Sequence, residues 1–388
     1  MKNILYLHAG AELYGADIVL LQLMKNLDKE KYKLHIILPC DGPLVKEMEN
    51  IGAKVSVLEY PILRRKYFNP KGIIDYAIEF KRNVKILKKY CLDNNIEVVH
   101  SNTMAVLEGA ALKRALDIHH VWHIHEIITK PKVINKFLCK VISKTANRVI
   151  AVSNAVKNHL LDTGYFKTTP VDVIYNGIDN TVFNENNKVD YLKEEYNIKE
   201  DEVVVGLIGR VNSWKGQESF LEALNHVLPK YPKAKAMMVG GVFQGEEWRM
   251  ESLKEKVENS PAKDRIIVED YRSDTKNVHC LYDIFVLPSI QPDPLPTVVL
   301  EAMASGKPVI GYRHGGVTEM VKENYNGLFA EVCDPEDLGK KIEVLLNDKN
   351  LRETYGKNSC TRQRESFSLE SYVRNFEKVY DIRSERER

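Results

Sequence analysis

The 388-residue sequence predicts an α/β protein made of two doubly wound domains, each with a parallel sheet covered by helices on both faces. Three observations support this fold class. Short apolar runs alternate with longer segments whose apolar residues have helical spacing. The alternation stops at a polar stretch, residues 180–202, and then starts again. The chain is also longer than the roughly 250–300 residues at which a single core stops growing.

The first domain is expected over residues 1–183. Its predicted strands are the apolar runs NILYLHA, KLHIILP, AKVSVLE, IEVVHSN, HVWHIHE and RVIAVS, and VDVIYNGID at 171–179 ends the series. The segment ADIVLLQLMKNLDKE, which follows the first run, has helical spacing and is a predicted helix. Residues 180–202 are polar and charged, and we interpret them as a linker.

The second domain is expected over residues 184–367. Its predicted strands are VVVGLIGR, AKAMMVGG, RIIVED, YDIFVLPS and PVIGY, and its predicted helices are GQESFLEALNHVLPKYP, EWRMESLKEKVEN, TVVLEAMASG and DPEDLGKKIEVLLNDKNLRETYG. The tail, 368–388, is predicted to be a helix that packs back on the first domain. Ligands of open α/β sheets bind at the carboxyl ends of the strands, so site residues are expected in the loops that follow strands.

Composition excludes several classes of protein. A net charge of +2 argues against a dedicated nucleic-acid binder, which usually has a strong basic excess. The six cysteines form no CxxC pair and no metal-ligand spacing, which favours reduced thiols in a cytoplasmic protein. No apolar run reaches the roughly 18 residues of a membrane-spanning helix, and the N-terminus is a poor signal peptide.

The first candidate site is the loop GLIGRVNSWKGQ, residues 206–217. Arg210 and Lys215 follow a buried strand and precede a helix. A guanidinium fork and an ammonium point charge that converge on one anion would suit a diphosphate. The GxxxxGK[ST] pattern of a P-loop is absent. The alternative is a pair of solvated surface cations.

The second candidate is the proline-rich stretch that begins at Pro292. Prolines exclude strand and helix here, so Asp293 is expected in a rigid loop. The amides of Thr297 and Val298 are expected at a helix N-terminus, where free N–H groups and the helix dipole favour anions. Glu301 lies about one turn further on, and its carboxylate would accept hydrogen bonds from vicinal hydroxyls. Alternatively, Asp293 is a turn residue and Glu301 a surface residue.

Two further loops carry weaker signals. Gly315 and Gly316 form a turn that is expected to lie beside a phosphate or a sugar. In HAGAELYGAD, Gly10 and Gly15 would allow close backbone approach, but GxGxxG is missing, which disfavours NAD.

The run VWHIHEII places two histidines on one face of a strand. His123 and His125 form a His–X–His pair, and Glu126 follows on the other face or at the strand end. Such a pair could bind a metal, but no third ligand has a suitable context, so we predict no metal site. The alternative for His123 is a core or strand-end histidine.

Residues 61–90 hold nine Lys or Arg against two Asp or Glu. Apolar residues are interleaved with the basic ones, which favours a surface that meets anionic lipid headgroups. The alternative is a solvated helix face.

The order of these motifs resembles the retaining GT-B glycosyltransferases of family 4, of the type that builds bacterial surface polysaccharides such as capsule and lipopolysaccharide. The resemblance covers nearly the whole chain. It rests on GAELYGAD, HE at 125–126, VSNAVKNHL, YNGID with Phe183, GR and KG around Arg210 and Lys215, YRSD at 271–274, VLPS, DPLPTVVLEAMASGKPVI and GGVTE. The two-carboxylate block is the most specific of these motifs.

The resemblance implies a transfer of a hexose or related sugar from a UDP- or GDP-linked donor to a hydroxyl of a glycan or polyprenyl-diphosphate-linked acceptor. Arg210 and Lys215 would bind the donor diphosphate and stabilise the charge that develops as the sugar leaves. Asp293 would face the donor sugar, and Glu301 would hold the ribose. The other residues that it assigns to donor binding are Gly15, Tyr271, Arg272, Pro294, Leu295, Pro296, Thr297 and Val298.

The first domain would bind the acceptor. Gly10 and Gly15 would let the N-terminal loop close over the phosphates, with His125 near the hydroxymethyl group of the sugar and Glu126 beside it. The resemblance implies no cofactor and no bound metal, because cations replace Mg²⁺ on the diphosphate. The enzyme would work in the cytoplasm or on the inner face of the membrane, where residues 61–90 would contact lipid.

Two departures bear on the donor: Asp293 replaces the usual Glu, and Asp270 replaces a common Gly near the base. Two other functions stay open. One is a sugar-nucleotide epimerase of the same fold, which would need acid and base carboxylates in the first half. The other is a non-catalytic protein that binds a sugar nucleotide or a glycan.

Overall fold

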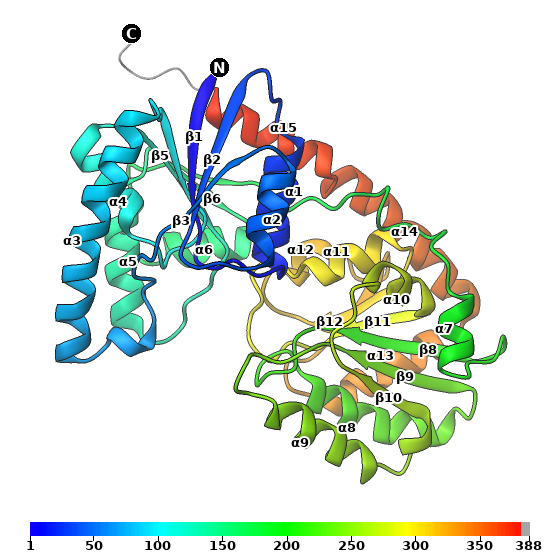
Figure 1. Cartoon of the computed structure of the whole chain (residues 1–388). Helices are drawn as coiled ribbons and strands as arrows, with labels where there is room; N and C mark the ends of the chain where they lie inside the picture. The colour runs from blue at the N-terminus through cyan, green and yellow to red at the C-terminus, as the bar shows by residue number, and fades with distance from the viewer. Residues whose placement is uncertain (382–388) are drawn as a thin grey trace. The chain divides into compact units, whose positions relative to one another are not determined.

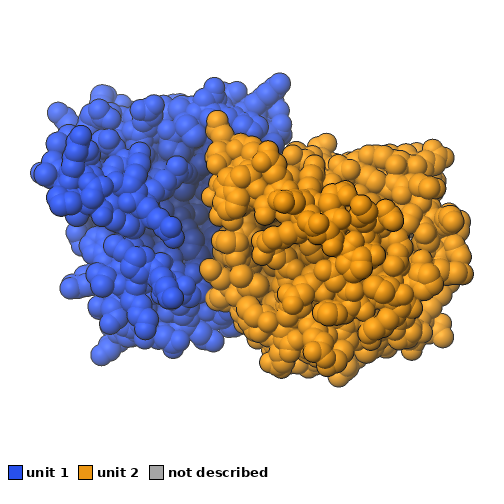
Figure 2. All heavy atoms as spheres, turned by 90° about the horizontal axis from the view of Figure 1, so that it is seen from below, with its two compact units in different colours: residues 1–177, 369–388 blue, residues 178–368 orange. Residues whose placement is uncertain are grey.

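The structure is a computed structural model and describes residues 1–381. The chain forms two compact units, drawn in blue and orange in Figure 2. Residues 1–177 and the C-terminal helix that starts at Leu369 make up unit 1. Residues 178–368 make up unit 2. The expected fold class is confirmed, since each unit is a parallel sheet with helices around it (Figure 1).

Within the described residues, unit 1 contains a seven-stranded parallel sheet in the order β3-β2-β1-β4-β5-β6-β7. The strands are β1 (Lys2–Leu7), β2 (Tyr32–Leu38), β3 (Lys54–Val57), β4 (Val98–Ser101), β5 (His119–Ile124), β6 (Arg148–Ala151) and β7 (Val171–Val173). The helices are α1 (Gly15–Asn26), α2 (Pro43–Asn50), η1 (Arg65–Tyr67), α3 (Pro70–Asp93), α4 (Glu108–Leu116), α5 (Lys132–Thr145), α6 (Asn154–Leu161) and α15 (Leu369–Tyr380). The order changes direction at β1 and β4, so the loops after these strands meet at one edge.

Unit 2 repeats this plan. Its described residues include a six-stranded parallel sheet in the order β10-β9-β8-β11-β12-β13. The strands are β8 (Val203–Ile208), β9 (Ala234–Val239), β10 (Ile266–Glu269), β11 (Ile284–Leu287), β12 (Val309–Tyr312) and β13 (Gly327–Ala330). The helices are α7 (Asp190–Glu195), α8 (Gln217–Val227), η2 (Leu228–Lys230), α9 (Trp248–Glu258), η3 (Lys263–Arg265), α10 (Thr275–Leu281), α11 (Thr297–Ala304), α12 (Val317–Met320), α13 (Pro335–Asn347) and α14 (Lys349–Ser366).

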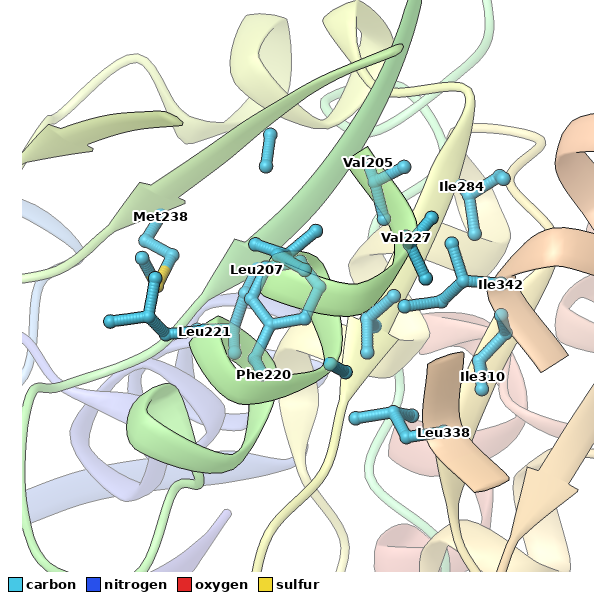
Figure 3. Packing of buried hydrophobic residues seen from close by; sticks show 14 of the residues in the cluster. Val205, Leu207, Phe220, Leu221, Val227, Met238, Ile284, Ile310, Leu338 and Ile342 are labelled. Atoms are coloured by element: carbon cyan, nitrogen blue, oxygen red, sulfur yellow. The ribbon is translucent and has the colours of Figure 1, made fainter. Parts of the chain in front are cut away.

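The core of unit 2 fixes the sheet against its helices. In Figure 3, Leu207 of β8 lies against Phe220 of α8, and Ile342 of α13 lies toward Ile310 of β12. These side chains are fully buried. Burial of a large apolar side chain contributes about 1.5–3 kcal/mol to the free energy of unfolding. This layer therefore fixes the positions of the carboxyl ends of β8 and β11 relative to each other.

Helix α15 completes the core of unit 1 rather than that of unit 2. Phe376 and Tyr380 are buried in the cluster that includes Tyr6 of β1 and Leu20 of α1. Lys2 Nζ also donates to the carbonyl of Tyr380 at 2.6 Å. Figure 1 shows α15 beside α1. The predicted helix, 368–388, thus spans residues 369–380 of the described chain, and 382–388 lie outside the described residues.

The boundary between the units lies before Ile178, earlier than the expected 183. Ile178 forms a β-bridge with Ser368 and donates its N–H to the carbonyl of Phe367 at 3.1 Å. These bonds attach residues 178–183 to unit 2. The linker expected at 180–202 contains α7, because Leu192 is fully buried and anchors a short helix. The single helix expected after Asp334 is interrupted at Asp348, whose side chain caps α14.

Glu108 is a buried acid at the start of α4. Its side chain is 0% exposed, and neither carboxylate oxygen has a hydrogen-bond partner among residues 1–381. Burial raises the pKa of Glu108 to about 8. Between its unfolded pKa and about 8, the unfolded chain loses this proton while the folded chain keeps it. This one group therefore lowers the free energy of unfolding by about 1.4 kcal/mol per pH unit as pH rises through that window.

We expect Glu108→Gln to be stabilising relative to the wild type at high pH. The amide is neutral at every pH, so the melting temperature of the variant minus that of the wild type should increase between about pH 5.5 and about pH 8.5. Differential scanning calorimetry at the two pH values measures this difference. Glu218→Gln is the control, because Glu218 is exposed on α8 and pairs with Lys256. An equal difference at both pH values would contradict the prediction.

Candidate functional site

The loop between β8 and α8 is ordered by its own polar groups. Asn212 Oδ1 accepts the backbone N–H groups of Trp214 at 3.1 Å and Lys215 at 3.0 Å. Gly216 has a φ of +86°, and a Cβ there would lie 1.9 Å from the carbonyl oxygen of Pro288. Only glycine fits this close approach to the end of β11. The loop therefore presents Lys215 in one defined direction.

Lys215 pairs with Asp293 across the sheet edge. The Lys215 Nζ lies 2.6 Å from Asp293 Oδ2, and the two side chains are 16% and 12% exposed. Ser289 Oγ donates to the same carboxylate oxygen at 3.1 Å. The sequence resemblance assigns the two residues to different groups, Lys215 to a diphosphate and Asp293 to a sugar. The structure brings them together, because β8 and β11 are neighbours in the sheet.

Arg210 lies on an aromatic ring. Its Cζ is 3.6 Å from the ring centroid of Phe243, in the loop that follows β9. Stacking on the ring holds the plane of the guanidinium in a defined orientation. Phe243 is 47% exposed and carried no signal in the sequence, since an aromatic residue in a loop has many explanations.

The proline-rich loop and the Gly-Gly turn form one packed structure. The N–H of Gly316 donates to the carbonyl of Asp293 at 2.7 Å. A Cβ at Gly316 would lie 2.0 Å from the carbonyl oxygen of Pro294, and Gly315 has a φ of +64°. The turn was expected beside a phosphate or a sugar, and it supports the Asp293 backbone from behind. This contact is a packing reason for two successive glycines.

Helix α11 begins directly after this loop. Pro296 is its N-cap and supplies no capping side-chain hydrogen bond. The first N–H groups of a helix have no intrahelical partner, so the amides of Thr297 and Val298 are disposed to meet an anion. Leu295 is buried and holds the loop against the core.

Glu301 is held by a histidine that the sequence reasoning missed. His279 Nε2 of α10 lies 3.1 Å from Glu301 Oε2. The His279 side chain is fully buried among the rings of Phe183, Tyr282 and Phe285. A rigid neighbour of this kind orients the carboxylate, which is otherwise 12% exposed. A lone histidine in a short amphipathic helix gives no such signal in the sequence.

If Glu301 holds the ribose of a sugar donor, as the resemblance implies, Glu301→Gln should raise the KM for that donor by about tenfold with kcat little changed. An amide keeps one acceptor oxygen but loses the charge, and hydrogen bonds to charged groups are worth about 1.5–3 kcal/mol. Loss of binding that is equal in the ground state and the transition state appears in KM. Initial rates over a donor series measure it, with Glu218→Gln as the control. A lower kcat at unchanged KM would contradict the ribose assignment.

Tyr271 and Arg272 differ in environment. Tyr271 is 60% exposed and lies two residues after the end of β10. Arg272 donates to Glu195 Oε1 at 2.7 Å and to Asp274 at 2.8 Å. Arg272 also donates to the hydroxyl of Tyr196 at 2.6 Å. Through these contacts Arg272 joins α7 to the loop before α10. That Arg272 lies near the base of the nucleotide donor stays a prediction.

In unit 1, His125 and Glu126 lie at the carboxyl end of β5. His125 Nε2 is 3.2 Å from His123 Nδ1, so the expected shared face is confirmed. Glu126 accepts the hydroxyl of Thr103 and the N–H of His125, the latter at 3.0 Å. Burial lowers the pKa of His125 to about 3 and raises the pKa of Glu126. The imidazole is therefore neutral at physiological pH.

The two N-terminal glycines lie on either side of a tight loop. Gly15 is the first residue of α1. A Cβ at Gly10 would meet Asp17 Oδ1 at 3.7 Å, an ordinary contact. Their contact with phosphates stays a prediction. Two residues here were missed, His8 and Asp17, whose side chains pair at 2.6 Å.

No group of three or more His, Cys, Asp or Glu side chains in residues 1–381 is arranged to hold a metal ion. No helix among the same residues combines the length and apolar character needed to cross a bilayer.

Two parallel doubly wound sheets with strand-end loops of this kind define the GT-B class of fold. The Glycosyltransferase Family 4 model matches residues 14–182, and the Glycosyl transferases group 1 model matches residues 189–362. Together these matches span most of the chain. The chain is a glycosyltransferase of the family 4 type and thus a transferase enzyme.

Similar proteins agree with this placement. The chain is 28% identical to the N,N'-diacetylbacillosaminyl-diphospho-undecaprenol alpha-1,3-N-acetylgalactosaminyltransferase of Campylobacter jejuni, over 96% of this chain and 97% of that protein. It is 26% identical to the UDP-Gal:alpha-D-GlcNAc-diphosphoundecaprenol alpha-1,3-galactosyltransferase of Escherichia coli, over 95% and 93%. The structure of Anabaena Alr3699/HepE in complex with UDP and glucose superposes with a TM-score of 0.83 at 22% identity, covering 98% of this chain and 99% of that chain. The two relatives are named as glycosyltransferases. This favours a transferase over the two alternatives, a sugar-nucleotide epimerase and a non-catalytic binding protein.

Proposed function

We propose that the enzyme transfers a hexose or related sugar from a UDP- or GDP-linked donor to a hydroxyl of a lipid-linked glycan in surface-polysaccharide synthesis. The observation that carries the proposal is the edge of the unit 2 sheet. There Lys215 and Asp293 pair at 2.6 Å beside the uncapped start of α11. A cation, a hydroxyl-binding carboxylate and free amides suit a sugar diphosphate. Two relatives named for diphosphoundecaprenol-linked acceptors support the lipid-linked acceptor.

Thermal shift with a panel of nucleotide sugars tests the donor. Each ligand that binds the folded chain raises the melting temperature by mass action, so the ranking identifies base and sugar together. We expect a UDP- or GDP-sugar to give the largest shift. Transfer to a synthetic polyprenyl-diphosphate sugar then tests the acceptor. Equal shifts for all nucleotides, with no transfer product, would refute the proposal.

The reaction is proposed to retain the anomeric configuration by front-face attack. The leaving phosphate would take the acceptor proton, while Arg210 and Lys215 stabilise its charge in place of a metal ion. The anomeric proton coupling of the product, measured by NMR before mutarotation, tests retention. Transfer at an unchanged rate in excess EDTA tests metal independence. An inverted product would overturn retention. Turnover that is sensitive to EDTA would overturn metal independence.

Residues 61–90 are proposed to contact anionic lipid from the cytoplasmic side. This segment forms η1 and most of α3. Ile74 and Ile78 are 60% and 63% exposed, and Lys81 and Lys85 continue the same helical face. Exposed isoleucines flanked by lysines suit an interface between headgroups and acyl chains.

We expect the double variant Ile74→Asp, Ile78→Asp to lose binding to anionic vesicles at low salt. Replacing two apolar contacts by charges that the surface repels should reduce the bound fraction at least about fivefold. Liposome flotation measures it. Val344→Asp is the control, since Val344 is 45% exposed on α13 of unit 2. Wild-type protein that fails to float would count against the membrane contact.

A further inference from the structure

The backbone of Arg210 is held at the ends of two neighbouring strands of unit 2. Val211, the next residue, donates its N–H to the carbonyl of Gly241 at 2.9 Å, which continues the pairing of β8 with β9 past the strand ends. Gln217 Nε2, at the start of α8, donates to the carbonyl of Arg210 at 3.0 Å. These bonds fix the Cα of Arg210, and other contacts must set the direction of its long side chain.

The loop after β9 packs directly on this segment. A Cβ at Gly240 would lie 2.1 Å from the carbonyl oxygen of Gly209, so only glycine allows the two strand ends to approach this closely. The loop covers residues 240–247 and ends where α9 begins. Backbone contacts that do not involve the Phe243 ring therefore fix the position of the loop relative to Arg210.

A turn within this loop presents Phe243. The carbonyl of Phe243 accepts the N–H of Glu246 at 2.9 Å, and Gly245 between them has a φ of +84°. Apart from its chain neighbours, no heavy atom of residues 1–381 would lie within 4 Å of a Cβ at Gly245, so the left-handed backbone alone favours glycine there. Arg249 Nε donates to Glu246 Oε2 at 2.8 Å and ties the turn to α9.

The ring of Phe243 lies against the guanidinium of Arg210. The distance of 3.6 Å from Arg210 Cζ to the ring centroid is well inside the roughly 6 Å limit of a cation–π contact. The ring is half-exposed, so it adds little to the core of unit 2. A free arginine side chain has many rotamers, and binding that selects one of them costs entropy. A ring that holds the guanidinium in advance reduces this cost.

We propose that Phe243 is a positioning residue that holds the guanidinium of Arg210 in the orientation that receives the donor diphosphate. The inference rests on the proposed function, in which Arg210 binds that diphosphate. Phe243 acts through Arg210 and needs no contact of its own with the donor. A small side chain at position 243 would let the guanidinium sample other rotamers, and the diphosphate would bind less tightly.

The orientation is measured by side-chain ¹H–¹⁵N correlation on the full chain labelled with ¹⁵N-arginine. Arg210→Ala assigns the Nε–H signal of Arg210, whose Nε is buried. A proton above an aromatic face is shielded, so we expect Phe243→Ala to shift this signal downfield and Phe243→Tyr to leave it in place. An Arg210 signal that stays unmoved in Phe243→Ala overturns the proposal, whether or not the protein binds a nucleotide.

Calorimetric titration with UDP and with GDP measures the consequence for binding. We expect Phe243→Ala to weaken binding of the nucleotide that the wild type prefers by about fivefold, the size of an exposed cation–π contact. Phe243→Tyr should keep the wild-type affinity. Trp248→Ala is the matched control, since Trp248 is 56% exposed and its ring centroid lies 4.4 Å from the Cζ of Arg249. Equal losses in Phe243→Ala and Trp248→Ala would overturn the proposal.

A double-mutant cycle separates positioning from direct contact with the nucleotide. In the Arg210→Ala background the ring has no guanidinium to hold, so Phe243→Ala should weaken binding by less than about twofold. A full fivefold loss in that background would mean that the ring touches the nucleotide itself, and it would overturn the proposal. If the Arg210 signal shifts as expected but the wild type binds neither UDP nor GDP, the proposed function fails and the placement of Arg210 by Phe243 stands.

Discussion

Lys215→Ala is expected to lower kcat for sugar transfer by about 10²–10³, the loss seen when one preorganised donor to a developing anion is removed. Lys215 supplies the ammonium group nearest Asp293, and the loop around Asn212 and Gly216 directs it. The charge on the leaving diphosphate grows as the sugar departs. An interaction with that charge strengthens in the transition state, so the loss should appear in kcat.

The same change leaves Asp293 without its cation, so a control must separate catalysis from structure. The double variant Lys215→Ala, Asp293→Asn removes the unpaired carboxylate. Transfer should stay low in it if Lys215 acts on the diphosphate. Recovery to wild-type turnover would show that the unpaired Asp293 caused the loss. Lys233→Ala is the matched surface control, since Lys233 is 71% exposed and pairs with Asp201.

Gly316→Ala is expected to reduce transfer by about tenfold or more and to lower the melting temperature by several degrees. A Cβ at this position would lie 2.0 Å from the carbonyl oxygen of Pro294, closer than non-bonded atoms allow. The φ of Gly316 is −66°, so the backbone itself tolerates alanine. The whole effect is therefore displacement of the loop that carries Asp293.

Gly339→Ala is the matched control for this variant. Gly339 lies within α13 of the same unit, and its Cβ would be 3.3 Å from a methyl group of Val227. Alanine also favours helix over glycine by about 1 kcal/mol, which offsets a tight contact. Transfer rates and melting curves of the two variants are compared. Wild-type transfer by Gly316→Ala would show that the Asp293 loop needs no support from the turn.

Much of the fold followed from local pattern. Buried parallel strands have continuous apolar runs, such as 203–208 and 284–287, and these became β8 and β11. The errors came where tertiary contacts override composition. Burial of Leu192 stabilises helix α7 within a polar segment. The β-bridge between Ile178 and Ser368 places the boundary between the two units earlier than expected. A single apolar residue in a charged stretch does not produce the repeated spacing of apolar residues that predicts a helix.

The candidate site divides in the same way. Arg210, Lys215 and Asp293 were candidates because they lie in loops after buried strands, and Glu301 because it lies one turn into the helix that follows. The order of the motifs, which resembles family 4, then favoured these residues over their structural alternatives. His279, Ser289, Phe243 and Asn102 were not selected. Ser289 acts on Asp293 within one loop that has no regular period. The other three act on residues far away in the chain, for example His279 on Glu301 and Asn102 on His8. Sequence spacing carries no information on such contacts.

The sequence by itself determined the class of fold and the type of glycosyltransferase, and it predicted which loops would form the candidate site, because burial pattern and loop chemistry are local properties of the chain. Only the tertiary structure decided that Lys215 faces Asp293 and that the Gly-Gly turn supports the proline loop. It also decided that the Asn102 side chain contacts four histidines, which are His8, His100, His123 and His125. These are contacts between strand ends that the sheet order makes neighbours. Sheet order is set by the packing of the whole domain, and no stretch of sequence contains it.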